Sequence, residues 1–210
     1  MDQDKKAELV ERILDSGFTY FRQYGIRAVT LDEIALQLGI SKKTIYEYFS
    51  GKDELVTSVI QKRVEHIQHK CLEYRKRASN AIEENILLMD YLDGLFRNMN
   101  PVILMDLQKF HPQAFQIFQQ HMHEFVFHSI EENLARGIRE GLYRPDLNVE
   151  ILSMFRLESS LLCFKPEAFP KDRFSMDIVQ RELLWHYLYG VSSPAGSEFL
   201  NAYRKTTSGS

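Results

Sequence analysis

The chain has 210 residues, of which 44% are hydrophobic and 26% are charged. This size and composition fit one compact globular chain or two small domains, and they exclude disordered, collagen-like and disulfide-rich classes. The formal net charge is −3, from 26 Lys and Arg against 29 Asp and Glu, so general attraction to a polyanion cannot be assumed. Any nucleic-acid site must therefore be a local basic patch.

The two cysteines, Cys71 and Cys163, are too few for a secreted disulfide scaffold and lack the CxxC spacing of zinc and redox sites. The first residues carry no apolar signal segment, and no uncharged apolar run reaches the 18 residues of a membrane span. We therefore expect a cytoplasmic protein with no membrane-spanning helix and no cofactor.

Apolar residues recur every three or four positions along nearly the whole chain, and most of the ten glycines and six prolines fall between these segments. This pattern predicts an all-α fold of about nine to ten helices. A disordered tail is expected at 207–210. The expected helices are 5–24, 31–38, 42–48, 52–77, 82–99, 101–110, 112–140, 147–164, one that ends at Gly190, and a short one from Pro194.

Strong start and stop signals define two short helices after the first predicted helix. Thr30 and Glu33 have the spacing of a capping box before residues 31–38, and Gly39 suits the left-handed C-cap of that helix. Ser41 can cap the next one. Two short helices at a tight turn, packed on an amphipathic helix, are typical of a helix-turn-helix unit whose second helix enters the DNA major groove.

The outer face of the second short helix carries side chains suited to DNA. Lysine donates to guanine, and aromatic edges contact thymine methyls, so Lys42, Lys43 and Tyr46 are candidate base readers. Between residues 39 and 52, three lysines oppose one glutamate, which gives a local charge of +2. Plain solvated scaffold is the alternative interpretation. The candidate phosphate contacts are Thr44, Tyr48 and Lys52.

The segment TLDEIALQLGISKKTIYEYFSGKDEL, residues 30–55, resembles the DNA-binding domain of the TetR family of bacterial transcription regulators. The resemblance covers residues 5–56 well, and the rest of the chain only by its helix count and the turn at 141–146. It implies a homodimer that binds a palindromic operator, and a larger helical domain that binds a small molecule and releases the DNA. By motif position, Thr30 joins the backbone-contacting residues. Asp32 departs from the pattern, since some members of the family place a cationic or polar DNA contact at this position. An acid there would repel phosphate.

We expect residues 1–51 to form the DNA-binding domain and residues 52–206 to form a ligand-binding and dimerisation domain, with residues 52–77 as the strut between them. A ligand would tilt this strut and change the spacing of the two reading helices. Aromatic and methionine side chains crowd the middle of the second domain, where they form either plain core or an apolar pocket. The candidate pocket residues are Met89, Phe96, Met105, Phe110, Phe118, Met122 and Phe125.

Histidines cluster in the same region. His121, Glu124 and His128 have the three- and four-residue spacing at which helical side chains can converge on a metal. No second ligand group accompanies them, and exposed His and Glu pairs are common, so we expect no metal site. A pH-sensitive role of these histidines is left open.

Two C-terminal helices carry more apolar residues than one small domain covers, so two from each subunit would make a four-helix interface. An enzyme finds no support, because GxGxxG, Walker, HExxH and nucleophile-elbow motifs are absent from the sequence. The alternative is a helical interaction protein whose helix-turn-helix binds a protein partner. Repression is the family default, and the sequence identifies neither effector nor operator. The expected interface residues are Leu152, Phe155, Leu162, Leu184, Trp185 and Leu188.

Overall fold

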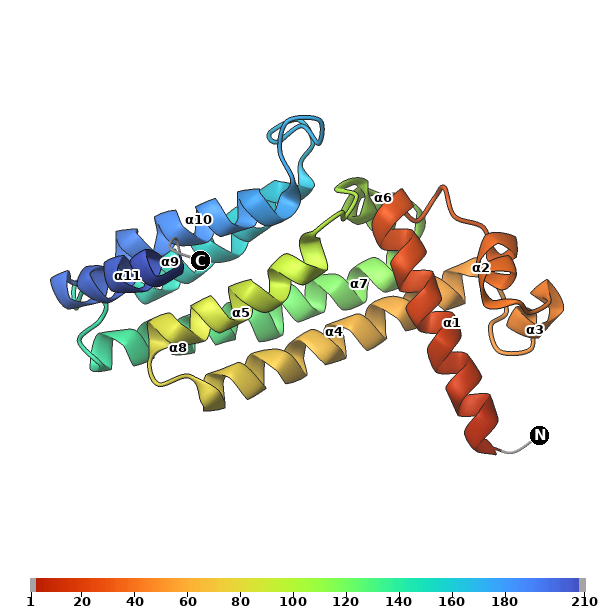
Figure 1. Cartoon of the computed structure of the whole chain (residues 1–210), viewed down its shortest axis with the longest axis horizontal. Coiled ribbons are helices and arrows are strands. Elements are labelled where there is room, and N and C mark those ends of the chain that lie inside the picture. Colours follow the sequence, from red (N-terminus) through yellow and green to blue (C-terminus); the bar gives the residue numbers. More distant parts are fainter. Residues whose placement is uncertain (1–2, 208–210) are drawn as a thin grey trace.

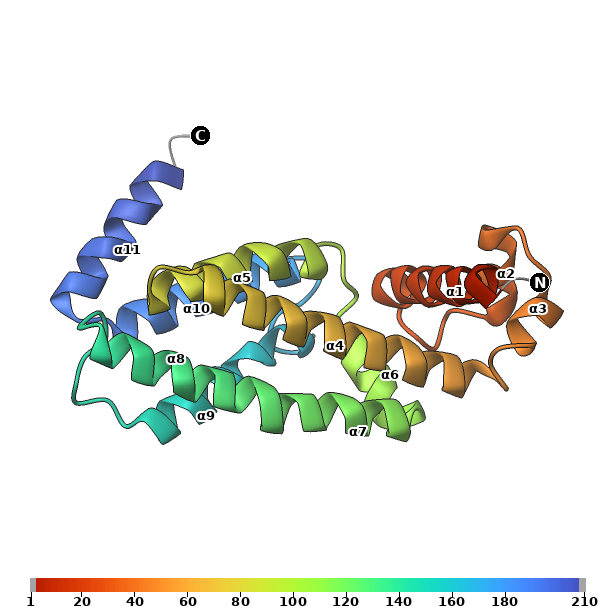
Figure 2. The ribbon, with the colours of Figure 1, turned by 90° about the horizontal axis from the view of Figure 1, so that it is seen from below.

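The computed structural model describes residues 3–207, and these form helices and connecting turns, with one isolated bridge between Tyr143 and Ser192. A π-helical segment continues one α-helix into the next, so the described residues make ten helical rods. The all-α prediction and the expected number of helices are confirmed. The molecule is elongated, with the first three helices at one end and the last helix at the other (Figures 1 and 2).

The bounds of the elements agree closely with the periodicity of the sequence. The last helix reaches residue 207, so the tail predicted at 207–210 is too long, and residues 208–210 lie outside the described residues. The elements are α1 (Gln3–Tyr24), α2 (Leu31–Leu38), α3 (Lys42–Tyr46), α4 (Lys52–Arg77), α5 (Ala81–Phe96), α6 (Val102–Phe110), α7 (Pro112–Gln120), the π-helix η1 (His121–Val126), α8 (Phe127–Arg139), α9 (Val149–Ser160), the 3-10 helix η2 (Leu162–Phe164), α10 (Met176–Val191) and α11 (Pro194–Thr207).

Local capping explains where the two short helices begin and end. The Thr30 hydroxyl accepts a hydrogen bond from the backbone N–H of Glu33 at 3.2 Å, and the Glu33 carboxylate accepts one from the Thr30 N–H at 2.7 Å. Gly39 ends α2 with a φ of +66°, in the left-handed region that glycine adopts without strain. Ser41 caps α3 by accepting from the Thr44 N–H at 3.1 Å. The predicted capping box and caps are confirmed, although α3 is two residues shorter than expected.

The N-terminal helices share their core with the first turns of α4. Ile13 and Phe21 of α1, Ile34 of α2 and Ile45 of α3 are buried together with Val56 of α4. Burial of such side chains contributes about 1.5–3 kcal/mol each. The long helix α4 therefore starts inside the helix-turn-helix core and then runs along the larger domain, where it packs against α5 and α7.

A second core fills the far end of the molecule and corrects part of the expected dimer interface. Leu184, Trp185 and Leu188 of α10 are only 3%, 7% and 0% exposed, because they pack with side chains of α5, α8 and α11. Their periodicity suggested a surface that needed a partner. Side chains of α5 and α8, together with Leu200 of the chain's own last helix, cover that surface instead.

The helix predicted at 147–164 is broken in the structure. It begins at Val149, ends at Ser160 and continues as the short η2, which no glycine or proline signals. A tertiary contact accounts for the break: the Gln180 amide of α10 donates to the Ser160 carbonyl oxygen and contacts the Cys163 Sγ at 3.1 Å. The carbonyl at the end of α9 is thereby satisfied by a side chain distant in the sequence.

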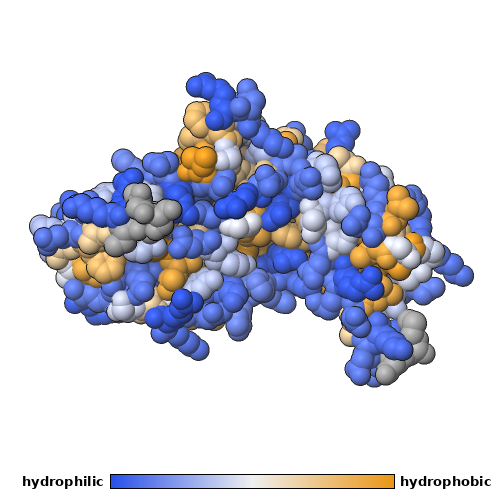
Figure 3. Space-filling view, in the orientation of Figure 1, coloured by the Kyte–Doolittle hydropathy of each residue, from blue (hydrophilic) through white to orange (hydrophobic). Residues whose placement is uncertain are grey.

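The face of the molecule seen in Figure 3 is mostly hydrophilic, with hydrophobic residues in separate patches. Within residues 3–207, none of the helices is both long enough and apolar enough to cross a bilayer.

The packing of Gly137 gives a direct test of the far-end core. A Cβ at this α8 glycine would lie 2.0 Å from the Tyr143 Cδ2, so Gly137→Ala should lower the unfolding free energy by about 1–3 kcal/mol. Thermal unfolding followed by circular dichroism should then show a midpoint lower by about 2–4 °C for each kcal/mol. Gly190→Ala is the matched control, since a Cβ there meets nothing within 4 Å. Equal midpoints for the two variants would contradict this packing.

Candidate DNA-binding face and ligand cavity

The start of α3 presents the three predicted base readers on the surface, at the end of the molecule that carries α1–α3 (Figure 1). Ile45 is fully buried, which turns the opposite side of this helix outward. Lys42, Lys43 and Tyr46 are all exposed on that side. A short helix with its first turn exposed and basic has the shape and charge needed to enter a major groove.

Lys42 is paired with an acidic residue of the same chain. Its Nζ donates to the Asp32 Oδ2 at 2.7 Å, and this hydrogen bond raises the pKa of Lys42. Both side chains are exposed, so the pair contributes little to stability. Asp32 therefore does more than repel phosphate at a distance, because it also occupies the ammonium group of a predicted base reader.

The predicted phosphate-contacting residues lie around the same end, but each already has a role in the fold. The Thr30 hydroxyl belongs to the capping box of α2, and the Thr44 Oγ1 lies 2.9 Å from the Ser41 Oγ. Tyr48 is half-buried against the helix-turn-helix core. Phosphate contact by these groups stays a prediction, and it would add to their structural roles.

Lys52, in the first turn of α4, donates from its Nζ to the Arg27 carbonyl oxygen at 3.3 Å. Burial lowers the pKa of this lysine, even though Asp106, Asp53 and Glu33 act in the opposite direction. The lysine opposes the dipole of its own helix, and the Arg27 carbonyl offsets part of that cost. Lys52 therefore holds the turn after α1 to the start of α4.

Polar and aromatic residues of α6 and its C-cap contact the helix-turn-helix end of the molecule. The buried Asp106 carboxylate accepts a hydrogen bond from the Arg27 N–H at 2.9 Å. The Phe110 ring lies under the Arg27 guanidinium, with 5.3 Å between its centroid and the Arg27 Cζ. At the end of α6, the buried His111 places its Nδ1 2.7 Å from the Asp53 Oδ1 of α4. Polar and aromatic contacts thus fasten α6 to the helix-turn-helix.

The turn after α1 approaches α6 closely at Gly25. This glycine has a φ of +86°, and a Cβ there would lie 2.9 Å from the Val102 Cγ2. The position thus needs glycine both for its backbone conformation and for the space. Nearby, the Asn100 N–H donates to the Arg22 carbonyl oxygen at 2.7 Å.

The opposite face of α6 forms one wall of an apolar cavity. The cavity has a volume of about 230 Å³ and lies between α4, α5, α6, the α7–η1 segment, α9 and α10. Ile103, Leu104 and Leu107 contribute the α6 wall. One short helix therefore contacts the cavity on one side and the DNA-binding end on the other. The predicted pocket residues that line this cavity are Phe96, Phe118 and Met122.

The other four predicted pocket residues lie elsewhere. Met105 and Phe110 are exposed on the outer face of α6, because its helical phase turns the three cavity residues inward. Met89 lines a separate cavity of about 30 Å³, and Phe125 lines a neighbouring cavity of about 120 Å³. The periodicity of the sequence identifies which residues share a helical face, but it does not tell which face borders the cavity.

Sequence reasoning missed the polar groups of the cavity wall, which are Arg63, Asn85, His121, Arg156, Ser160 and Gln180. Arg63 is paired, with its Nη2 2.6 Å from the Asp15 Oδ1. Burial lowers the pKa of His121 to about 4, so this imidazole is neutral at pH 7. An arginine or glutamine has no sequence signal that distinguishes a cavity position from an ordinary surface position.

The histidine spacing considered for a metal does not bring its members together. His121 lies in η1 and its Nδ1 is 3.3 Å from the Gln68 Nε2, whereas His128 Nδ1 is 2.8 Å from the Glu131 Oε2. Among residues 3–207, no three His, Cys, Asp or Glu side chains are grouped so as to hold a metal ion. The π-helical turn changes the register on which the helical spacing argument depends.

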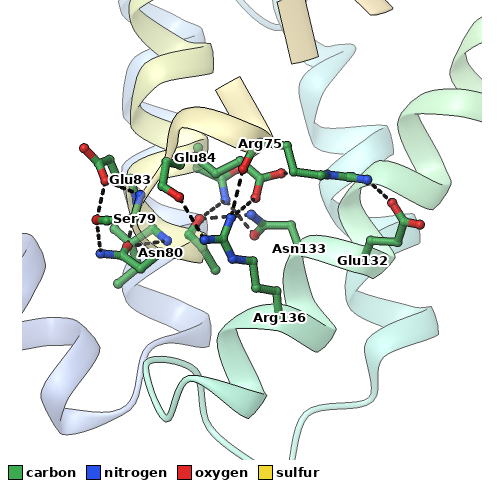
Figure 4. A network of polar contacts seen from close by, with 12 residues as sticks. Arg75, Ser79, Asn80, Glu83, Glu84, Glu132, Asn133 and Arg136 are labelled. Atoms are coloured by element: carbon green, nitrogen blue, oxygen red, sulfur yellow. Dashed lines mark hydrogen bonds and ion pairs between the residues drawn. The ribbon is translucent and has the colours of Figure 1, made fainter. Parts of the chain in front are cut away.

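A polar network fixes the far end of α4 (Figure 4). The Arg136 guanidinium of α8 contacts Glu84 of α5 at 3.0 Å and donates to the Ala78 carbonyl oxygen, just after α4, at 2.9 Å. Arg75 of α4 contacts Glu84 at 3.4 Å and also pairs with Glu132 of α8. The end of α4 distant from the DNA-binding face is thus tied to two other helices.

Comparisons with known proteins agree with this geometry. Residues 13–59 match the model of the family described as bacterial regulatory proteins, tetR family. The chain is 30% identical over 105 residues to the uncharacterized HTH-type transcriptional regulator YvaF of Bacillus subtilis, an alignment covering 50% of this chain and 55% of that protein. It is 24% identical over 207 residues to the HTH-type transcriptional repressor KstR2 of Mycolicibacterium smegmatis, covering 90% and 93% of the two chains.

A solved structure extends the likeness to the larger domain. The fold resembles that of the transcriptional regulator FadR from Bacillus subtilis in complex with stearoyl-CoA, with a TM-score of 0.65, 17% identity, and coverage of 86% of this chain and 98% of that one. Residues 13–59 therefore carry the helix-turn-helix domain of the tetR family, and over most of its length the chain is similar to helix-turn-helix transcriptional regulators.

The pair between Lys42 and Asp32 predicts the effect of removing the acid. Asp32→Asn should raise affinity for duplex DNA by about two- to tenfold at low salt and steepen the salt dependence by about one unit, because one repelling charge is lost and one lysine is released. Fluorescence anisotropy with a labelled duplex measures both quantities. Glu198→Gln, at an exposed position of α11, is the control for net charge alone. Unchanged or weaker binding by Asp32→Asn would count against the assignment of Lys42.

Proposed function

We propose that this regulator is a homodimeric repressor that binds a palindromic operator and leaves it when a small, mainly apolar molecule enters the cavity of each subunit. The observation that carries the proposal is the double contact of α6, which borders the cavity with Leu104 and holds the helix-turn-helix with Asp106. Residues 1–51 act as the reading head and residues 52–206 as the ligand-binding and dimerisation domain. Because its proposed target is operator DNA, the protein acts in the cytoplasm.

In this proposal the start of α3 reads the bases. Lys42 and Lys43 donate to guanine, and Tyr46 contacts a thymine methyl. Thr30, Thr44, Tyr48 and Lys52 contact the phosphates around the groove and set the register of the head on the duplex. Because the chain as a whole is acidic, this local group supplies the attraction to DNA.

The dimer forms through the exposed apolar side chains of α9 and the start of α10. Ile151 is 64% exposed and Phe155 is 51% exposed, and Met154 and Ile178 are exposed beside them. Leu152 is half-buried on α9, and Leu162 follows in η2. Exposed apolar side chains gathered on helices favour self-association, and a two-fold axis buries the same surface twice. Two heads one DNA turn apart, about 34–36 Å, then read the two half-sites.

The ligand acts through α6 and α4 together. A molecule in the cavity presses on Leu104 and Leu107, and α6 transmits this to Arg27 through Asp106 and to Asp53 through His111. The far end of α4 is held, so its first turns move with the reading head. Coupling of this kind typically amounts to about 1–3 kcal/mol, or roughly 5–150-fold in operator affinity.

Selection from a randomised duplex library tests the proposal. The full chain is incubated with the library at moderate salt, the retained duplexes are sequenced, and the selection is repeated with Lys42→Ala combined with Tyr46→Ala. Enrichment of one inverted repeat, lost in the double variant, supports a dimeric sequence reader. Absence of enrichment from the wild-type chain would contradict the proposal and favour a helix-turn-helix that binds a protein partner.

Substitution of Lys52 and of Lys42 should change DNA binding in different ways. Lys52→Ala should weaken binding to all duplexes similarly and flatten the salt slope by about one unit, because it removes a phosphate contact. Lys42→Ala should instead relax the preference at one base position, where a good contact discriminates by about 1–3 kcal/mol. Binding to a panel of single-base operator variants at several salt concentrations separates the two. Identical profiles for both variants would show that the roles are wrongly assigned.

Phe155→Glu should convert the dimer to a monomer, because the carboxylate would be buried without a partner in the interface. Light scattering after gel filtration measures the mass, and circular dichroism checks that the helix content is retained. Leu36→Glu is the control, at an apolar and even more exposed position on α2 outside the proposed interface. A dimer that survives Phe155→Glu at micromolar concentration would refute this interface.

A further inference from the structure

One arginine of the cavity wall has no partner of opposite charge. Arg156 of α9 lines the cavity beside Ser160, Phe164 and Gln180. Its Nη1 atom has essentially no exposure to solvent and makes no hydrogen bond. Among the described residues, no carboxylate pairs with it, and the groups that influence its charge are Tyr187 and Cys163.

Three other arginines of the larger domain are paired with carboxylates. Arg136 contacts Glu140 at 2.7 Å, Arg181 contacts Asp90 at 3.4 Å, and Arg63 contacts Asp15 at 2.6 Å. Buried charges in proteins are as a rule paired, because an isolated ion loses its hydration without compensation. The departure of Arg156 from this rule occurs inside the cavity and not on a solvated surface.

The contacts that Arg156 does make leave its charge uncompensated. Its guanidinium lies over the Tyr187 ring, with 5.7 Å between the Cζ and the ring centroid. Burial lowers the pKa of Arg156, which means that the surroundings disfavour its charge. Arginine nevertheless stays protonated in proteins, so the positive charge persists.

None of the other described residues of the cavity wall carries a positive charge without a paired carboxylate. His121 is neutral at pH 7, and the charge of Arg63 is already matched by Asp15. The Gln180 amide is engaged by the Ser160 carbonyl oxygen and the Cys163 Sγ. Most of the other wall residues are leucine, isoleucine, phenylalanine or methionine. The cavity therefore presents one positive group without a paired carboxylate to a mainly apolar space.

We propose that the effector is an apolar molecule bearing one carboxylate, and that this carboxylate binds the Arg156 guanidinium. The inference rests on the proposed function, since it names the chemical class of the ligand for the same cavity. A guanidinium offers two parallel N–H donors that match the two oxygens of a carboxylate. The apolar body of the ligand then lies against the leucines of α5 and α6, where it replaces no hydrogen-bonded group.

The test uses decanoate, decanol and decyl phosphate with the purified full chain and no DNA, below their micelle concentrations, by isothermal titration calorimetry. Decanoate should bind the wild-type chain at least about tenfold more tightly than decanol, because a charge-assisted pair replaces an unpaired cation. Arg156→Met should remove that difference and leave decanol binding within about twofold. Equal binding of decanoate and decanol to the wild type would overturn the proposal. Tighter binding of decyl phosphate would overturn the carboxylate assignment.

Two variants separate the role of Arg156 from effects on folding. Arg156→Met should unfold at the same or a higher temperature without ligand, because it removes an uncompensated buried charge. Arg156→Lys keeps the charge but loses the two-donor fork, so it should retain only part of the preference for decanoate. Arg181→Met, on α10 and paired with Asp90, is the matched control and should bind decanoate like the wild type. Loss of decanoate binding in this control as well would contradict a specific role of Arg156.

The assay without DNA keeps this inference apart from the proposed function. Decanoate that binds through Arg156 but does not lower operator affinity would contradict the proposed release mechanism and support the carboxylate site. Operator release by decanol but not by decanoate would contradict the carboxylate site and support the release mechanism.

Discussion

The structure depends most on the contact between α6 and the turn that follows α1. The buried Asp106 carboxylate accepts the Arg27 N–H, and the Arg27 guanidinium lies over the Phe110 ring. Gly25 permits the close approach of the two segments. Because the inner face of α6 borders the cavity, the position of the reading head and the volume available to a ligand are set by the same nine-residue helix. A regulator needs such a shared element if a ligand is to change its affinity for DNA.

The long helix α4 is the second connection between the helix-turn-helix and the larger domain. Its first turns are buried in the helix-turn-helix core, whereas its last turn is held by Arg75 and, through the Ala78 carbonyl, by Arg136. Because α4 is tied to other helices at its far end and packs against α1 and α7, its first turns can move only together with the reading head. The close approach of the His111 Nδ1 to the Asp53 Oδ1, at 2.7 Å, links the two routes at the start of α4. The polar groups thus lie where the helices are joined, and the apolar groups lie where a ligand would fit.

Much of the fold was predictable because its causes are local. The capping box of Thr30 and Glu33, the left-handed Gly39 and the apolar period of α4 depend only on residues close in sequence. The failures depend on tertiary contacts. The end of α9 is set by Gln180, the burial of Trp185 by α11, and the outward turn of Met105 by the packing of α6. The unpaired charge of Arg156 is likewise a property of the assembled helices, since no pattern in the sequence tells which arginine will lack a carboxylate.

The central claim, that the cavity and the reading head are coupled through α6, can be tested without knowing the ligand. Leu92→Trp places a bulky side chain in the cavity wall, and Asp106→Ala removes the acceptor of the Arg27 N–H. Operator affinity is measured for the wild type, each single variant and the double variant. The account predicts that Leu92→Trp weakens operator binding roughly 5–150-fold in the wild-type chain and much less in the Asp106→Ala background, a coupling of about 1–3 kcal/mol. Strictly additive effects, or wild-type affinity for Leu92→Trp, would contradict it.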